Sequence, residues 1–285
     1  MSHIVMNETE GQLASGNLLP VNGTELFVRV IGPEGAPWVV LLNSMAADTN
    51  MWSAQVSALS KRYRVMCMDW RGHGGSLNEP GPYSLDMLVN DVLELMNAVG
   101  ASHPHIVGTS LGGMIAMVIA IEKRAPIASL TVCSALSKIS PTMKKWWEEI
   151  AAQVDREGVG QEIVESTLSR WFTPEYASAN PQIIAQTRSM IARTSRDAYS
   201  GCIAAFKNLD LFNQLSNVDV PTLFLVGKED PASTPEIMQD MHRQVKGSLF
   251  EVINHAAHLP SIEQPKAVNQ ALLRFIETIP ERGVS

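Results

Sequence analysis

The hydrophobic residues of this chain fall into two patterns that alternate along the sequence. Short continuous apolar runs are typical of strands buried on both faces, and apolar residues three and four apart indicate helices. The runs predict strands over residues 25–31, 38–42, 63–68, 127–135, 222–226 and 249–252. The spacing predicts helices over 85–99, 111–123 and 265–279. This alternation favours an α/β fold with a mostly parallel central sheet and helices on both faces.

The alternation stops after Ala135 and resumes near Thr222. Between these points the pattern predicts helices alone, over 141–155, 160–170, 181–194 and 196–206. We interpret residues 138–214 as a helical cap, inserted after the strand of 127–135, which we take as the sixth strand of the sheet, in a core formed by 18–137 and 215–282. The insertion starts just beyond the carboxyl end of a predicted strand, the edge at which ligands bind in open α/β sheets.

Composition and charge narrow the function. The 285 residues are 45% hydrophobic, enough for a sizeable core, and carry a formal net charge of −7. Nucleic acids and acidic membrane surfaces call for clustered basic residues, so we expect neither as a partner. The longest clean apolar run, 114–121, is too short to span a bilayer, and residues 1–17 lack the features of a signal peptide. We therefore expect a cytoplasmic protein, as a monomer or a homo-oligomer.

The cysteines are few and far apart. Cys67, Cys133 and Cys202 form an odd set with wide spacing, which suits a reducing compartment and not a disulfide framework. Cys67 and Cys133 fall in predicted strands, where we expect them to be buried as small hydrophobic residues. The chain has no C-x-x-C or H-x-x-x-H pattern, so we expect no metal and no cofactor.

Residues 108–112 carry the strongest chemical signal. They read Gly-Thr-Ser-Leu-Gly, a G-x-S-x-G motif between a predicted strand and a predicted helix. A sharp strand-to-helix turn exposes the hydroxyl of Ser110 and needs small residues two positions to either side. The alternative, a nucleotide-binding turn, lacks support because no G-x-G-x-x-G follows the first long strand and no Walker lysine is present. We therefore assign Ser110 as a nucleophile.

A nucleophilic serine needs a histidine base and an acid that orients the histidine. Where a serine nucleophile stands at such a strand-to-helix turn, the chain order is Ser, then Asp or Glu, then His. His255 and His258 both follow the last predicted strand and remain as candidate bases. The acid should follow a late strand, where Glu229 and Asp230 stand. We assign Asp230, with Glu229 as the alternative, because Asp230 precedes a proline and should be held in a rigid turn.

The oxyanion of an acyl-transfer reaction needs two backbone N–H donors. One comes from the residue after the nucleophile, Leu111, and the other from the loop after an earlier strand. That loop is 43–46, and we assign its donor to Met45, with Ser44 as the alternative.

These positions resemble the 3-oxoadipate enol-lactonases and their esterase relatives within the α/β hydrolases. The likeness covers nearly the whole chain and is carried by Leu42-Asn43-Ser44-Met45, the D-x-R-G-H-G-x-S turn of 69–76, Trp171-Phe172-Thr173-Pro174, Asp230-Pro231-Ala232 and Ala257-His258-Leu259. The resemblance implies a hydrolase that cleaves a small ester or lactone through an acyl-enzyme. It favours His258 over His255 as the base. His73, in the second motif, is interpreted as a structural turn residue.

The chain departs from that family near the substrate. Thr109 and Leu111 flank the serine where the family usually has Leu and Met, and Met45-Ala46-Ala47 replaces Leu-Gly-Thr. Lys138 stands where the family usually carries an arginine suited to the substrate's free carboxylate. The resemblance therefore implies that Lys138 binds this group, without the bidentate fork of arginine. We also expect pocket or cap packing from Trp52, Trp146 and Trp171.

Three functions remain open on these grounds. The first is a lactonase or carboxylesterase, with 3-oxoadipate enol-lactone as the leading substrate. The second is a cofactor-free haloperoxidase-like perhydrolase that uses the same three residues. The third is a non-catalytic protein that binds a small ligand, and the complete Ser–Asp–His set weighs against it because binding alone does not need that set.

Overall fold

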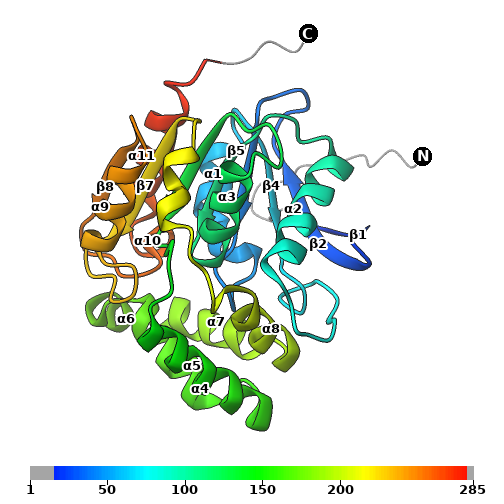
Figure 1. Cartoon of the computed structure of the whole chain (residues 1–285), viewed down its shortest axis with the longest axis vertical. Helices are drawn as coiled ribbons and strands as arrows, with labels where there is room; N and C mark the ends of the chain where they lie inside the picture. Colours follow the sequence, from blue (N-terminus) through cyan, green and yellow to red (C-terminus); the bar gives the residue numbers. More distant parts are fainter. Residues whose placement is uncertain (1–15, 281–285) are drawn as a thin grey trace.

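A computed structural model describes residues 16–280, and a sheet of eight strands runs through its centre (Figure 1). The strand order is β1-β2-β4-β3-β5-β6-β7-β8. β2 pairs antiparallel with β1 and with β4, and every other neighbouring pair is parallel. The strands are β1 (Asn17–Val21), β2 (Thr24–Ile31), β3 (Trp38–Leu42), β4 (Arg64–Met68), β5 (His105–Thr109), β6 (Ser129–Cys133), β7 (Thr222–Gly227) and β8 (Leu249–Ile253). The mostly parallel α/β fold expected from the sequence is confirmed.

The central strands are continuous apolar runs because helices cover the sheet. Every residue of β5, β6 and β7 is buried. α3 (Leu111–Ile121) is buried along its whole length and packs on β5 and β6, and α2 (Leu85–Val99) packs against α3. α1 (Ser53–Leu59) and α11 (Pro265–Ile276) pack against each other. A parallel sheet of this kind presents the carboxyl ends of β3, β5, β7 and β8 at one edge.

Five α-helices lie between β6 and β7, where the sequence predicts an insertion. They are α4 (Pro141–Glu157), α5 (Gln161–Trp171), α6 (Pro174–Ala179), α7 (Pro181–Ala192) and α8 (Arg196–Phe206). α4 packs against α8, and α5 packs against α7. Figure 1 shows them gathered beyond one end of the sheet, drawn in green to yellow-green. The division into a 138–214 cap and a core of 18–137 and 215–282 stays an interpretation of this arrangement.

Several short elements have no clear apolar pattern, and the sequence analysis missed them. β1 is an edge strand that contains a proline and leaves most of its residues at least partly exposed. α9 (Pro235–Gln244) is mainly polar and buries only two methionines. The other short elements that the sequence analysis missed are η1 (Thr49–Trp52), α1, α6, η2 (Phe212–Asn217) and α10 (Pro260–Glu263).

The sequence also carries expectations about the cysteines, about membrane spans and about the N-terminal residues. Cys67, Cys133 and Cys202 are all free thiols buried in the structure. Among the helices of residues 16–280, none has both the length and the apolar character needed to cross a membrane. The expectation that residues 1–17 carry no signal peptide falls almost entirely outside the described residues.

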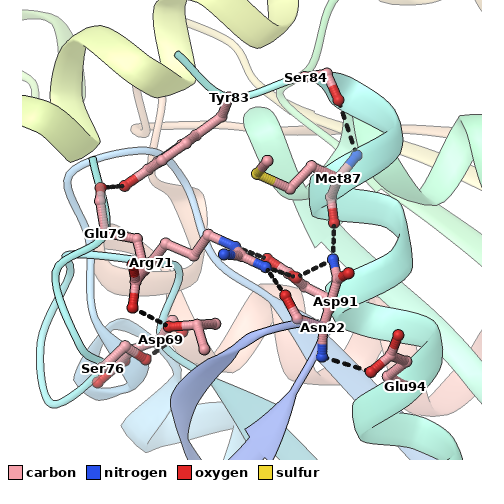
Figure 2. Close-up of polar contacts among 11 residues, drawn as sticks. Asn22, Asp69, Arg71, Ser76, Glu79, Tyr83, Ser84, Met87, Asp91 and Glu94 are labelled. Carbon is pink, nitrogen blue, oxygen red and sulfur yellow. Dashed lines mark hydrogen bonds and ion pairs between the residues drawn. The ribbon is translucent and has the colours of Figure 1, made fainter. Parts of the chain in front are cut away.

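A buried ion pair ties the turn after β4 to α2, and Figure 2 shows the two side chains lying against each other. Nε and Nη2 of Arg71 donate to the two carboxylate oxygens of Asp91, at 2.7 and 2.6 Å. Nη2 of Arg71 also donates to the backbone oxygen of Asn22, at 2.8 Å. Arg71 and Asp91 are 5% and 0% exposed, so neither charge can turn to water when its partner is lost.

Replacing Arg71 with methionine should lower the free energy of unfolding by about 3–5 kcal/mol, because Asp91 is left as an uncompensated buried charge. Urea denaturation measures this loss. Arg62→Met is a matched control, since it breaks the surface pair with Glu277 and should cost within about 1 kcal/mol. Equal losses of unfolding free energy in the two variants would show that burial does not increase the contribution of the Arg71–Asp91 pair to stability.

Candidate active site

Ser110 occupies a strained turn between β5 and α3. Its φ of 54° and ψ of −114° are rare for a residue with a side chain, and such strain is typical of a nucleophile held at a sharp turn. A Cβ on Gly108 would lie 2.2 Å from the backbone oxygen of Gly112, and one on Gly112 would lie 2.3 Å from that of Leu42. Both positions therefore require glycine, as the G-x-S-x-G interpretation expects. The strand–turn–helix context predicted for residues 108–112 is present.

Asp230 and His258 meet at the carboxyl ends of the adjacent strands β7 and β8. Nδ1 of His258 lies 2.9 Å from Oδ2 of Asp230, and both side chains are buried. The other carboxylate oxygen of Asp230 accepts hydrogen bonds from the backbone N–H groups of Ala232 and Ser233, at 2.9 and 3.0 Å. The turn after β7 thus fixes the carboxylate, and the carboxylate fixes the imidazole.

Asp230 stays ionised despite its burial. Burial alone would raise the pKa of the carboxyl, but the nearby His258 and the N–H donors of Ala232 and Ser233 bring it below its usual value. A carboxylate accepts from Nδ1–H, so Nε2 of His258 is left as the acceptor. Nε2 is the nitrogen that a general base needs free.

The alternative acid and base lie apart from this pair. Glu229 is exposed, and its carboxylate accepts from the backbone N–H of Ala256 at 2.9 Å. His255 is exposed at a left-handed φ of 57°, and its backbone oxygen accepts from Gln264. Glu229 and His255 therefore shape the loop after β8, while Asp230 and His258 face each other inside it.

Two backbone N–H groups beside Ser110 have no hydrogen-bond partner among residues 16–280: those of Met45 and Leu111. Leu111 begins α3, so its N–H has no acceptor within the helix. The N–H of Ser44 donates to Sδ of Met51 at 3.4 Å. Of the two donors left open by the sequence, the geometry favours Met45 over Ser44.

Ser110, His258, Met45 and Leu111 line one cavity of about 390 Å³ beneath the inserted helices. Its wall is mainly apolar, and the hydroxyl of Ser110 makes no hydrogen bond within the described part of the chain. We expect the bond from this hydroxyl to Nε2 of His258 to form when substrate binds, as is common in enzymes without ligand. The hydrophobic residues that line the cavity include Met45, Leu111, Met114, Leu136, Met143, Trp146, Trp147, Trp171 and Phe206.

Arg170 is the cation in the cavity wall, and the sequence analysis missed it. Its guanidinium lies 4.8 Å from the ring centre of Trp146 and 5.4 Å from that of Trp147. It donates to the backbone oxygen of Ser166 and to the hydroxyl of Thr167, at 3.1 and 3.3 Å. No carboxylate of residues 16–280 lies within ion-pair distance of it. Burial lowers the pKa of the guanidinium, which remains charged.

The helical register of α5 could have revealed Arg170. Thr167, Arg170 and Trp171 are three and four residues apart, share one face of the helix, and all line the cavity. Because Trp171 was already expected at the pocket, its neighbour on that face was a natural candidate.

Lys138 and Trp52 lie elsewhere than expected. The backbone of Lys138 forms a β-bridge with Asp210, and its exposed ammonium pairs with the Asp210 carboxylate at 3.0 Å. Neither Lys138 nor Trp52 lines the cavity; Trp52 is buried in the core of the sheet domain. Trp146 and Trp171 do line it. Among residues 16–280 no group of three or more His, Cys, Asp or Glu side chains is placed to hold a metal.

Comparisons with known proteins agree with this architecture. Residues 37–265 match the family model described as alpha/beta hydrolase fold. The chain is 34% identical to 3-oxoadipate enol-lactonase 1 of Acinetobacter baylyi, over 90% of this chain and 95% of that one. The enol-lactonase from Burkholderia xenovorans LB400 superposes with a TM-score of 0.87 at 31% identity, covering 92% and 100% of the two chains. A malate-bound thermophilic esterase from Thermogutta terrifontis superposes with a TM-score of 0.85 at 30% identity, covering 94% and 99%.

Proposed function

Since this chain belongs to the α/β-hydrolase family, we propose that it hydrolyses a small anionic lactone or ester through an acyl-enzyme, with 3-oxoadipate enol-lactone as the leading substrate. Carboxylic ester hydrolysis is the activity of its enol-lactonase relatives in Acinetobacter baylyi and Burkholderia xenovorans. The observation that carries the proposal is one cavity lined by Ser110, His258, Met45 and Leu111, in which Asp230 holds the imidazole of His258 from behind the wall.

In the proposed reaction, Oγ of Ser110 attacks the carbonyl carbon while Nε2 of His258 takes the hydroxyl proton. The carbonyl oxygen becomes an oxyanion that accepts from the N–H groups of Met45 and Leu111. The tetrahedral intermediate then collapses, the C–O bond of the ring breaks, and His258 returns the proton to the leaving oxygen. Water, activated by His258, attacks the acyl-enzyme and restores Ser110.

Asp230 supports both halves of this cycle. It holds the imidazole of His258 with Nε2 toward Ser110, and it stabilises the imidazolium that forms after proton transfer. Its lowered pKa keeps it ionised, so it can do this throughout the neutral range.

The proposal assigns the substrate carboxylate to Arg170. A charge in an apolar cavity needs a partner, because desolvation otherwise outweighs binding. Arg170 offers a planar guanidinium with no competing carboxylate among the described residues, stacked above Trp146 and Trp147. The expectation that Lys138 binds this group is replaced, because Lys138 is paired with Asp210 at the surface.

Replacing Arg170 with methionine should cost roughly 1–3 kcal/mol in kcat/KM for the anionic lactone, about five- to 160-fold, the range for losing a charged hydrogen bond. Methionine keeps apolar contact with the two tryptophans, so a neutral p-nitrophenyl ester should lose far less. Steady-state kinetics on both substrates measures the difference. Lys138→Met is the matched control and should show no selective loss. A selective loss in Lys138→Met and none in Arg170→Met would restore Lys138 as the anchor.

The function itself is tested by a hydrolysis panel. Purified enzyme is compared on 3-oxoadipate enol-lactone, neutral lactones, short p-nitrophenyl esters and a peracid-forming assay. We expect the highest kcat/KM on the enol-lactone and a burst of p-nitrophenol from the esters. Turnover confined to neutral esters would overturn the enol-lactone assignment, and no turnover on any of them would favour a protein that only binds its ligand.

A further inference from the structure

The D-x-R-G-H-G-x-S turn of residues 69–76 is held rigidly, although none of its side chains reaches the cavity. Asp69 accepts from the backbone N–H groups of Thr49 and Gly75, at 2.6 and 2.9 Å. The hydroxyl of Ser76 donates to the backbone oxygen of Asp69 at 2.7 Å, a contact visible in Figure 2. With the Arg71–Asp91 pair, these bonds anchor the turn to α2 and to the start of η1.

His73 projects from this turn toward the loop that follows β3, and its two ring nitrogens have fixed roles. Nδ1 lies 2.8 Å from the backbone oxygen of Arg71, which can only accept, so Nδ1 carries the proton. Nε2 must then be the acceptor, and it receives the backbone N–H of Ala46 at 3.0 Å. The ring is 1% exposed, and burial lowers the pKa of His73 to about 4, so the ring is neutral near pH 7.

The bond to Ala46 acts on a strained part of the loop. Ala46 has a φ of 64°, in the left-handed region that a residue with a Cβ avoids unless its surroundings impose it. Ala46 directly follows Met45, which lines the cavity with Ser110 and whose N–H has no partner among the described residues. The Ala46 N–H belongs to the Met45–Ala46 peptide, and the Met45 N–H belongs to the adjoining Ser44–Met45 peptide. Holding the first peptide therefore restrains the backbone of Met45, on which the direction of its N–H depends.

We propose that His73 is a positioning residue for the oxyanion hole: its Nε2 holds the N–H of Ala46 and so aims the N–H of Met45 at the substrate's carbonyl oxygen. This rests on the proposed function, because Met45 is a donor only if an oxyanion forms at Ser110. His73 never touches the substrate, and its contribution should appear in the transition state and not in the binding of substrate.

Three substitutions at His73 separate this role from packing. Glutamine can place an acceptor near the position of Nε2, whereas asparagine keeps only a donor near Nδ1, toward the oxygen of Arg71. Leucine removes both. We expect His73→Gln to retain most of kcat, and His73→Asn and His73→Leu to lose about ten- to hundredfold in kcat, less than deletion of a whole oxyanion donor. KM for p-nitrophenyl acetate should change little in all three variants.

A second measurement reads the oxyanion hole directly. Oγ of Ser110 adds to the carbonyl carbon of a short alkyl trifluoromethyl ketone, and the proton of the Ser110 hydroxyl passes to His258. The ketone oxygen then becomes an oxyanion in the oxyanion hole. The inhibition constant of the ketone should rise in His73→Asn and His73→Leu in parallel with the loss in kcat, and remain near the wild-type value in His73→Gln. Thermal unfolding of each variant shows that the activities compare folded proteins.

The outcomes are separable. If His73→Gln loses as much kcat as His73→Leu, or if no variant loses kcat, His73 is a structural turn residue and the inference is wrong. If His73→Leu does not fold, the contrast between glutamine and asparagine decides the same question. Failure of the proposed function has a different signature, since the wild-type enzyme would then lack hydrolysis, or Ser110→Ala would retain it.

Discussion

Replacing Ser110 with alanine should lower kcat by about 10⁴ to 10⁶, the loss that follows removal of a member of such a triad. In the proposed mechanism the hydroxyl oxygen forms the acyl bond, and of the hydroxyl side chains that line the cavity only that of Ser110 stands at the turn after β5. The backbone should be unaffected, because alanine meets the same steric limits at a φ of 54° as serine does. Burst and steady-state release of p-nitrophenol from a short ester measures the loss.

Folding and binding provide the control for this variant. The thermal midpoint of Ser110→Ala should match the wild type, because removing one hydroxyl from a partly exposed turn leaves little void. The variant should still bind the anionic lactone, which calorimetry can follow without turnover. Retention of more than a tenth of the wild-type activity in a folded Ser110→Ala variant would remove Ser110 from the mechanism.

The turn around Ser110 could be predicted from the sequence because it depends on local steric rules. Gly108 and Gly112 are required because any Cβ at these positions would make contacts of under 2.5 Å. The pentapeptide therefore predicts the turn, and the turn requires the two glycines of the pentapeptide. The carboxyl ends of adjacent parallel strands lie side by side, which is why residues after β7 and β8 could be expected to meet. The buried strands were equally predictable, because a sheet covered on both faces needs continuous apolar runs.

The substrate-facing residues could not be predicted in this way. Lys138 follows the strand end closely, yet the bridge to Asp210 turns it outward, and Asp210 lies 72 positions later in the chain. Arg170 stands in the wall because α4 supplies Trp146 and Trp147 beneath its guanidinium. Such contacts between helices depend on tertiary packing, so they cannot be predicted from the charges or the residue spacing within one segment.

The oxyanion loop shows the same limit on a smaller scale. The sequence left Ser44 and Met45 open as donors because both follow β3 directly. The side chain of Met51 resolves the choice by accepting the N–H of Ser44, and the ring of His73 accepts that of Ala46. Both acceptors come from elements whose placement the apolar pattern does not specify.

Replacing His258 with alanine should be about as damaging as Ser110→Ala, and the double variant should be scarcely worse than either single variant. The two residues act as one unit, so removing the second after the first leaves only the catalysis that the oxyanion hole and substrate binding provide. Asp230 would remain ionised but would have no imidazole to orient. Steady-state kinetics on a p-nitrophenyl ester, with the enzyme concentration raised for the slow variants, measures all three.

His255→Asn is the matched control for the base. His255 lies three residues away in the same loop, is exposed, and has a left-handed φ of 57° that asparagine tolerates. The substitution should therefore keep the loop and the bond from Gln264 to the backbone, and change kcat little. If His255→Asn lost activity as severely as Ser110→Ala while His258→Ala did not, the buried contact between His258 and Asp230 would stabilise the structure and take no part in catalysis. The base would then have to reach Ser110 from the exposed side of the loop.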